Sequence, residues 1–287
     1  MRRVLFYGGA SLLSNIWSRY WKENFDVYIG LHKKWIEIEG VKSIQLNEEI
    51  NELENLLKHY KIDIIINCSG LANVEECEKN PDLAYYLNGS LPGELAKIAY
   101  KSKVKLLHIS TDHLFDGKKK RSNETCTLNP LNTYAKSKAM GDNIVLENNS
   151  SALVLRTNFF GNGPSYKLSF SDKIISALKK NERIFLFSNV FFTPIHVHHL
   201  ADCSLKLIEL NSEGIYNICS NERLSKFDFG IMIAEKMKKD PALIVPIKIE
   251  EKTDLTLRPK DMSLANEKFI QKTGMDIDPL IKQINNL

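Results

Sequence analysis

The sequence has few of the features that would place it outside the ordinary globular proteins. Its 287 residues include five cysteines, none of them in a Cys-x-x-Cys spacing. An odd number of scattered cysteines predicts neither a disulfide framework nor a structural zinc site. No apolar run reaches the ~18 residues of a membrane span, and the N-terminal segment has no signal-peptide core. We therefore expect a soluble cytoplasmic protein that does not bind a membrane.

An excess of one charge is also missing. The net charge is +4, from 39 Lys+Arg against 35 Asp+Glu. This mild excess fits an anionic ligand and does not require nucleic acid. The short basic run at 118–121 is typical of a solvated loop, so we expect no nucleic-acid partner. His196, His198 and His199 have no acidic or cysteine partner at ligand spacing, and we predict no metal site.

Short apolar runs alternate with amphipathic stretches through the first half of the chain. The pattern predicts strands at 3–7, 25–29, 63–67, 104–110 and 152–156, and helices at 12–20, 51–60 and 134–148, with one long helix or a pair of helices at 81–100. Strands that alternate with helices predict an α/β fold, a doubly wound parallel sheet of the Rossmann type. Ligands of such sheets bind beyond the carboxyl ends of the strands.

The turn after the first strand lacks most glycines of a dinucleotide-binding loop. In a Gly-x-x-Gly-x-x-Gly frame the slots are Gly8, Ser11 and Ser14. Small residues still allow backbone N–H groups to approach a pyrophosphate. An ordinary strand-to-helix turn explains this segment about equally well.

An acid after the second strand, which NAD-specific folds use to bind the ribose 2′-hydroxyl, is absent too. His32, Lys33 and Lys34 stand there instead. We therefore predict NADPH as the cofactor, with NADH as the alternative. A solvated basic turn is the competing interpretation of these residues.

What the sequence does contain is a Tyr-x-x-x-Lys pair, Tyr134 and Lys138. A tyrosine can protonate a nascent alkoxide when a cation lowers its pKa from ~10. A lysine four residues later on a helix lies one turn away on the same face. Only one of the ten tyrosines has this spacing, but chance alone gives about one such pair in a chain of this composition. The neighbouring segments must therefore show whether this pair is catalytic.

Those segments carry a family resemblance. Residues 106–117 include Ser110-Thr111-Asp112, and residues 130–142 include the Tyr-x-x-x-Lys pair. Together with 63–70, Arg156-Thr157 and Arg258-Pro259, they resemble the dTDP-4-dehydrorhamnose reductase family of the extended short-chain dehydrogenases. The resemblance covers nearly the whole chain. It implies an NADP-binding Rossmann domain at 1–157, to which residues of about 188–212 return, and an interleaved smaller substrate-binding lobe at 158–287.

The resemblance also implies an activity and its residues. The family reduces the C4 keto group of a nucleotide-linked 4-keto-6-deoxy sugar, in surface polysaccharide or deoxysugar biosynthesis, and its members are habitually homodimers. Catalysis would then fall to Thr111, Tyr134 and Lys138. The cofactor would meet Gly8, Ser11, Leu12, Leu13, His32, Lys33, Cys68, Ser69, Gly70, Tyr134 and Lys138. The substrate would meet Thr111, His113, Asn158, Phe159 and Arg258.

Several departures from the family pattern leave the nucleotide, the sugar and the C4 stereochemistry open. Besides the two serines in the glycine frame, Asn158-Phe159 replaces a segment that carries tryptophan in the family. A non-catalytic NADP-binding regulatory subunit of the same fold is the alternative function. The retained Thr111, Tyr134 and Lys138 argue against it. An epimerase or dehydratase ranks lower, because Thr111-Asp112-His113 lacks the acid pair of the dehydratases.

Overall fold

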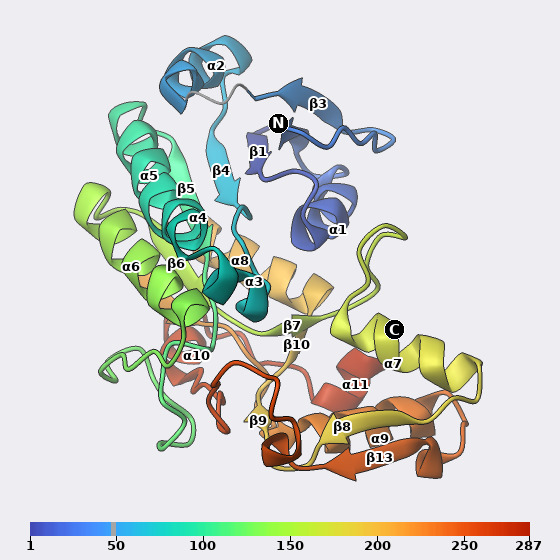
Figure 1. The fold of residues 1–287 in the computed structure, drawn as a ribbon. Helices are drawn as coiled ribbons and strands as arrows, with labels where there is room; N and C mark the ends of the chain where they lie inside the picture. The colour runs from blue at the N-terminus through green and yellow to red at the C-terminus, as the bar shows by residue number, and fades with distance from the viewer. Residues whose placement is uncertain (47–49) are drawn as a thin grey trace. The chain divides into compact units, whose positions relative to one another are not determined.

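A seven-stranded parallel sheet is built mainly from the first half of the chain (Figure 1). The structure is a computed structural model and describes residues 1–46 and 50–287. Leu5 lies between Tyr28 and Ile65 of the two neighbouring strands, both in parallel register. The strand order is β11-β6-β5-β4-β1-β2-β3, with bounds β1 Arg3–Tyr7, β2 Asp26–Leu31, β3 Lys42–Gln45, β4 Ile64–Asn67, β5 Lys105–Ile109, β6 Leu153–Arg156 and β11 Gly214–Asn217. The predicted doubly wound α/β fold is confirmed.

Helices cover both faces of this sheet. Alternate residues of a strand point to opposite sides, so each apolar strand contributes to two cores. On one face Leu5 and Ile65 belong to a core that includes residues of α2, α5 and α6. On the other, the rings of Phe6 and Trp21 lie 5.8 Å apart, and Trp21 stacks on Trp17. The helices of this part of the chain are α1 Leu12–Trp21, α2 Leu53–Tyr60, α3 Val74–Lys79, α4 Pro81–Tyr85, α5 Leu91–Lys101 and α6 Thr133–Asn148, with a 3-10 turn at Ile50–Glu52 and a π-helical turn at Tyr86–Ser90.

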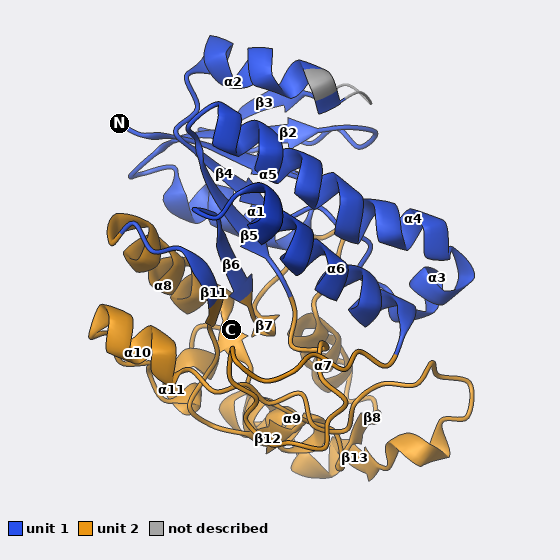
Figure 2. Ribbon diagram, turned by 90° about the vertical axis from the view of Figure 1, so that its left-hand side faces the viewer, with its two compact units in different colours: residues 1–110, 132–155, 211–215 blue, residues 111–131, 156–210, 216–287 orange. Residues whose placement is uncertain are grey.

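Contacts group the chain into two compact units (Figure 2). Unit 1 holds residues 1–110, 132–155 and 211–215, and unit 2 holds residues 111–131, 156–210 and 216–287. The predicted division at residue 157, with a return at 188–212, stays a prediction. The grouping by contacts differs from it in three places: 111–131 and 156–157 belong to unit 2, and of the later chain only 211–215 belong to unit 1.

Unit 2 is assembled from short elements around an aromatic core. The ring of Phe229 lies 5.0 Å from that of Phe160 and 5.5 Å from that of Phe192, and all three are buried. The elements are β7 Phe159–Phe160, α7 Phe170–Lys179, β8 Ile184–Phe187, β9 Phe191–Phe192, β10 Ile195–His196, α8 Val197–Glu209, β12 Leu224–Ser225, α9 Lys226–Lys236, β13 Ile244–Ile247, α10 Glu267–Thr273 and α11 Leu280–Ile284, with 3-10 turns at Pro241–Leu243 and Ile249–Glu251. Among the residues that the structure describes, no helix has the length and apolarity needed to cross a bilayer.

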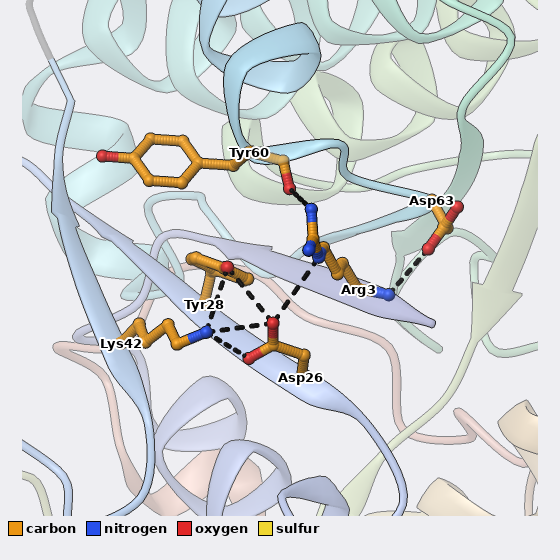
Figure 3. A network of polar contacts seen from close by, with 6 residues as sticks. All are labelled: Arg3, Asp26, Tyr28, Lys42, Tyr60 and Asp63. Carbon is orange, nitrogen blue, oxygen red and sulfur yellow. Dashed lines mark hydrogen bonds and ion pairs between the residues drawn. The ribbon is translucent and has the colours of Figure 1, made fainter. Parts of the chain in front are cut away.

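A polar network ties together the amino ends of β1, β2 and β3 (Figure 3). The Asp26 carboxylate accepts from Lys42 Nζ at 2.7 Å and from the Tyr28 hydroxyl at 3.2 Å, and Arg3 Nε lies 3.5 Å from it. The hydrogen bond from Lys42 lowers the pKa of Asp26. The network lies at the amino ends of the strands, whereas ligands of such sheets bind beyond the carboxyl ends.

We expect Asp26→Asn to lower the free energy of unfolding by about 0.5–1 kcal/mol at pH 7, because ion pairs near the surface contribute little. Since folding lowers the pKa of Asp26, its carboxylate stabilises the fold above the unfolded pKa of about 3.9. This contribution is lost as the pH falls through the folded pKa. Urea unfolding at pH 7 and pH 2 measures both effects, with the exposed Glu23→Gln as control. An Asp26→Asn difference of equal size at both pH values would contradict the prediction.

Candidate active site

Serine hydroxyls close the turn between β1 and α1 where the glycine frame is broken. Ser11 is the N-cap of α1, and its Oγ accepts from the Ser14 backbone N–H at 3.2 Å. The Ser14 hydroxyl donates to the Gly8 carbonyl at 3.0 Å. Gly8 has φ +82°, and a Cβ there would lie 2.7 Å from the Ser69 backbone nitrogen. The one glycine that the motif frame retains, Gly8, therefore lies where the chain after β4 approaches most closely.

Three predicted cofactor-binding segments lie together at the carboxyl ends of β1, β2 and β4. The Cys68 N–H donates to the Tyr7 carbonyl at 2.9 Å. The His32 ring packs edge-on against the Tyr7 ring, with 5.5 Å between the centroids. Lys33, the next residue, is exposed. Of the other residues predicted to bind the cofactor, Leu13 is buried, and Ser11, Leu12 and Ser69 are half-buried.

Tyr134 and Lys138 lie one turn apart near the start of α6. Asn132 caps this helix, because its side chain accepts from the Ala135 N–H at 2.9 Å. Tyr134 is half-buried and Lys138 is 5% exposed. The helix predicted from residue 134 is thus in place, and it presents the two side chains on one face.

The Lys138 ammonium is held at the carboxyl end of β5. Its Nζ donates to the Ile109 carbonyl at 2.7 Å. Burial lowers the pKa of Lys138 to about 8, against the opposing effects of Asp142 and Cys68. Thr111 follows Ile109 closely in the chain but belongs to unit 2, whereas Lys138 belongs to unit 1.

The position of α6 is set by its packing against the π-helical turn. Asn88 in that turn accepts from the Leu71 N–H at 2.8 Å and donates to the Ser137 hydroxyl at 3.0 Å. One turn further along α6, a Cβ at Gly141 would lie 2.1 Å from the Asn88 carbonyl oxygen. These contacts fix Tyr134 and its helix against the segment that follows β4.

Three of the residues predicted to bind the substrate lie around Asp112 in unit 2. Its Oδ2 accepts from Asn158 Nδ2 at 2.8 Å, and Thr111 Oγ1 lies 3.4 Å from Oδ1. The His113 backbone N–H donates to Thr111 Oγ1 at 3.3 Å. Asp112 itself is 1% exposed. Sequence reasoning noted this aspartate only as part of a motif and did not assign it to the site.

Lys226 is a residue of this region that sequence reasoning missed, because no motif or spacing marks it. Its Nζ lies 3.3 Å from the centre of the Phe192 ring. Burial lowers the pKa of Lys226 to about 8, with Asp112 opposing, and burial raises the pKa of Asp112 to about 6. Burial, then Lys226 and Arg258, lower the pKa of His113 to about 3, so its ring is neutral.

The two remaining substrate-side residues also lie in unit 2. Phe159 is half-buried in β7, paired in parallel with Ile195 of β10. Arg258 is half-buried, and its Nε donates to the Thr256 carbonyl at 3.2 Å. His196, for which no metal site was predicted, has a structural role as the N-cap of α8. Its Nδ1 accepts a hydrogen bond from the His198 backbone N–H.

Comparison with known proteins assigns the chain to a family. The family model described as the RmlD substrate binding domain matches residues 2–287. A probable low-salt glycan biosynthesis reductase, Agl14 of Haloferax volcanii, is 31% identical over 66% of this chain and 64% of its own length. The spore coat polysaccharide biosynthesis protein SpsK of Bacillus subtilis is 26% identical over 96% of this chain and 93% of its own length. Methionine adenosyltransferase 2 subunit beta of Xenopus laevis is 27% identical over 96% of this chain and 83% of its own length.

Solved structures agree with this assignment. A hypothetical dTDP-4-dehydrorhamnose reductase from Sulfolobus tokodaii is 28% identical, with a TM-score of 0.84 over 99% of both chains. The dTDP-4-dehydrorhamnose reductase of Bacillus anthracis, solved in complex with NADP, shares the fold at 24% identity, with a TM-score of 0.86 over 99% of this chain and 98% of that chain. The resemblance seen in the sequence is confirmed: this chain belongs to the RmlD family of dTDP-4-dehydrorhamnose reductase-like sugar-nucleotide reductases.

Proposed function

We propose that the protein uses NADPH to reduce the C4 keto group of a nucleotide-activated 4-keto-6-deoxy sugar. The observation that carries the proposal is the buried Lys138 ammonium, held on Ile109 one helical turn from Tyr134. A half-buried phenol beside a cation suits proton donation to an oxygen on which negative charge develops. Family membership supports the reaction class.

The residues of unit 1 fit a dinucleotide cofactor. A Cβ at Gly8 would clash with the Ser69 backbone, so this glycine lets the β1–α1 turn pack against the segment that follows β4. The capped N-terminus of α1 follows directly, and such N-termini favour phosphate. His32 and Lys33 would meet the 2′-phosphate of NADPH, and Cys68, Ser69 and Gly70 the adenosine side. When bound, NADPH supplies the hydride for the sugar carbon.

The chemistry of the protein's own groups then concerns the C4 oxygen. Tyr134 donates its hydroxyl proton to that oxygen, and the Lys138 ammonium stabilises the phenolate that remains. Thr111 donates a second hydrogen bond to the same oxygen. We further propose that His113, Asn158, Phe159 and Arg258 bind the substrate, with the Arg258 guanidinium on its diphosphate.

A non-catalytic, NADP-binding subunit is the second candidate function. The similarity to a methionine adenosyltransferase β subunit motivates it. The retained Thr111 and Tyr134 argue against it, since binding the cofactor alone requires no general acid. We therefore favour the reductase.

The test is NADPH oxidation with a panel of dTDP-, GDP- and UDP-linked 4-keto-6-deoxy sugars, run in parallel with NADH. The reductase predicts turnover of at least one of them, with NADPH preferred because His32 and Lys33 replace the acid after β2. Tight NADPH binding without turnover of any 4-keto sugar nucleotide would instead support the non-catalytic subunit.

A further inference from the structure

Three buried polar residues near Lys138, namely Asn67, His108 and Asp142, form a cluster to which the proposed reaction gives no role. His108 is the residue before Ile109 in β5, and Asn67 ends β4. Asp142 lies on α6, one turn beyond Lys138. All three have side chains that are fully buried, at 0% exposure. Because burying polar groups costs free energy unless they are paired, such a cluster requires a specific arrangement of donors and acceptors.

Asn67 determines which nitrogen of His108 carries the proton. The Ser69 backbone N–H can only donate, and it lies 3.1 Å from Asn67 Oδ1, so that oxygen is the accepting end of the amide. Asn67 Nδ2 then donates to His108 Nδ1, 3.0 Å away. An accepting Nδ1 bears no proton. Since burial lowers the pKa of His108 well below its usual value, the ring is neutral and its proton is on Nε2.

The His108 Nε2–H faces two groups of α6. Nε2 lies 3.5 Å from Lys138 Nζ and 3.9 Å from Asp142 Oδ1. A ring N–H cannot accept a proton from an ammonium, but it can donate to a neutral amine. His108 therefore favours the neutral form of Lys138, whereas the Asp142 carboxylate favours the charged form.

Two other titratable side chains lie close to Lys138. Cys68, which follows β4, is an uncharged thiol at neutral pH, because burial raises its pKa to about 12. Tyr134, one turn before Lys138 on α6, is the proposed proton donor. The opposed pair that acts on Lys138 is therefore His108 from β5 and Asp142 from α6.

We propose that Asn67, His108 and Asp142 are positioning residues for Lys138: the first two present an N–H to its nitrogen and the third a carboxylate, and together they set how readily it gives up a proton. The consequence for catalysis rests on the proposed reductase function, in which the charged lysine stabilises the Tyr134 phenolate. The proton balance itself does not depend on any substrate.

The tautomer of His108 is the first test, and it uses the unaltered protein. Long-range 1H–15N NMR spectra of the ¹⁵N-histidine-labelled chain distinguish protonation at Nε2 from protonation at Nδ1. We expect Nε2–H, without change between pH 6 and pH 8. Protonation at Nδ1, or a ring that becomes charged in this range, would overturn the proposal.

The second test follows the titration of Lys138 in the substrate-free protein, by NMR of ¹³Cε-labelled lysine. We expect Asp142→Asn to lower the midpoint by about one pH unit, because a carboxylate that favours the ammonium is lost. Asp142→Glu should restore it, and Glu147→Gln, the same charge change at an exposed position of α6, should leave it unchanged. An unchanged midpoint in folded Asp142→Asn would refute the role of Asp142. If that variant does not fold, the His108 tautomer alone decides.

The reductase assay separates this proposal from the proposed function. With an active substrate, the alkaline limb of the kcat profile should move to lower pH in Asp142→Asn by the same amount as the NMR midpoint. A purely structural role for Asp142 would lower kcat at every pH without moving the profile. If no sugar nucleotide is turned over, the proposed function is wrong, but the titration result for Lys138 remains valid.

Discussion

Replacing Tyr134 by phenylalanine is expected to reduce kcat for the keto sugar nucleotide by about 10²–10⁴-fold, the usual contribution of a positioned general acid. The change removes one hydroxyl and leaves the ring in place near the start of α6. Nothing else among the proposed catalytic groups can supply the proton equally well. Thr111 is a far weaker acid, and the role proposed for the Lys138 ammonium is to stabilise the Tyr134 phenolate.

Two controls give this experiment its meaning. Tyr100→Phe makes the same change on α5, at a ring that is 60% exposed, and should leave kcat unchanged. The affinity of Tyr134→Phe for NADPH, measured by calorimetry, should stay within a few-fold of the parent, because the phosphate-binding groups proposed in unit 1 are untouched. Full activity of Tyr134→Phe would show that the proton comes from another group.

Replacing Gly141 by alanine is expected to destabilise the protein by about 3 kcal/mol, at the upper end of the cost of overpacking. In an ordinary helix interior the same change stabilises by up to about 1 kcal/mol. The sign reverses here because the added Cβ would lie 2.1 Å from the Asn88 carbonyl oxygen, and a backbone atom cannot swing away as a flexible side chain can. The helix must shift, and Tyr134 and Lys138 shift with it.

Urea unfolding measures this loss, and the reductase assay measures the displacement of the two side chains. Asn143→Ala is the matched control, since it places alanine at an exposed position of the same helix. We expect Gly141→Ala to lower both the free energy of unfolding and kcat, and Asn143→Ala to lower neither. A Gly141→Ala variant as stable as the parent would show that α6 and the π-helical turn do not meet as closely as the structure has them.

Local patterns were sufficient for much of the fold. The first strand was predicted at its observed bounds, 3–7, because its apolar run ends abruptly at a glycine. The helix at 133–148 was predicted to within a residue. The strand at 42–45 was missed, because it is a sheet edge with a single buried residue, Ile44. The strand at 214–217 was also missed, because its place beside β6 is set by a partner distant in sequence.

The candidate site divides in the same way. The sequence alone determined the doubly wound fold, the family and the pair Tyr134 and Lys138, because apolar periodicity and motifs are written in neighbouring residues. Asp142 lies one helical turn after Lys138 on α6, a spacing that the sequence does encode. Only the tertiary structure placed His108 of β5 beside Lys138, and Lys226 of α9 among the aromatic rings of unit 2. No spacing along the chain encodes these two meetings. Their burial then decides the protonation on which the chemistry depends, since desolvation acts through the packed fold and not through the residue type.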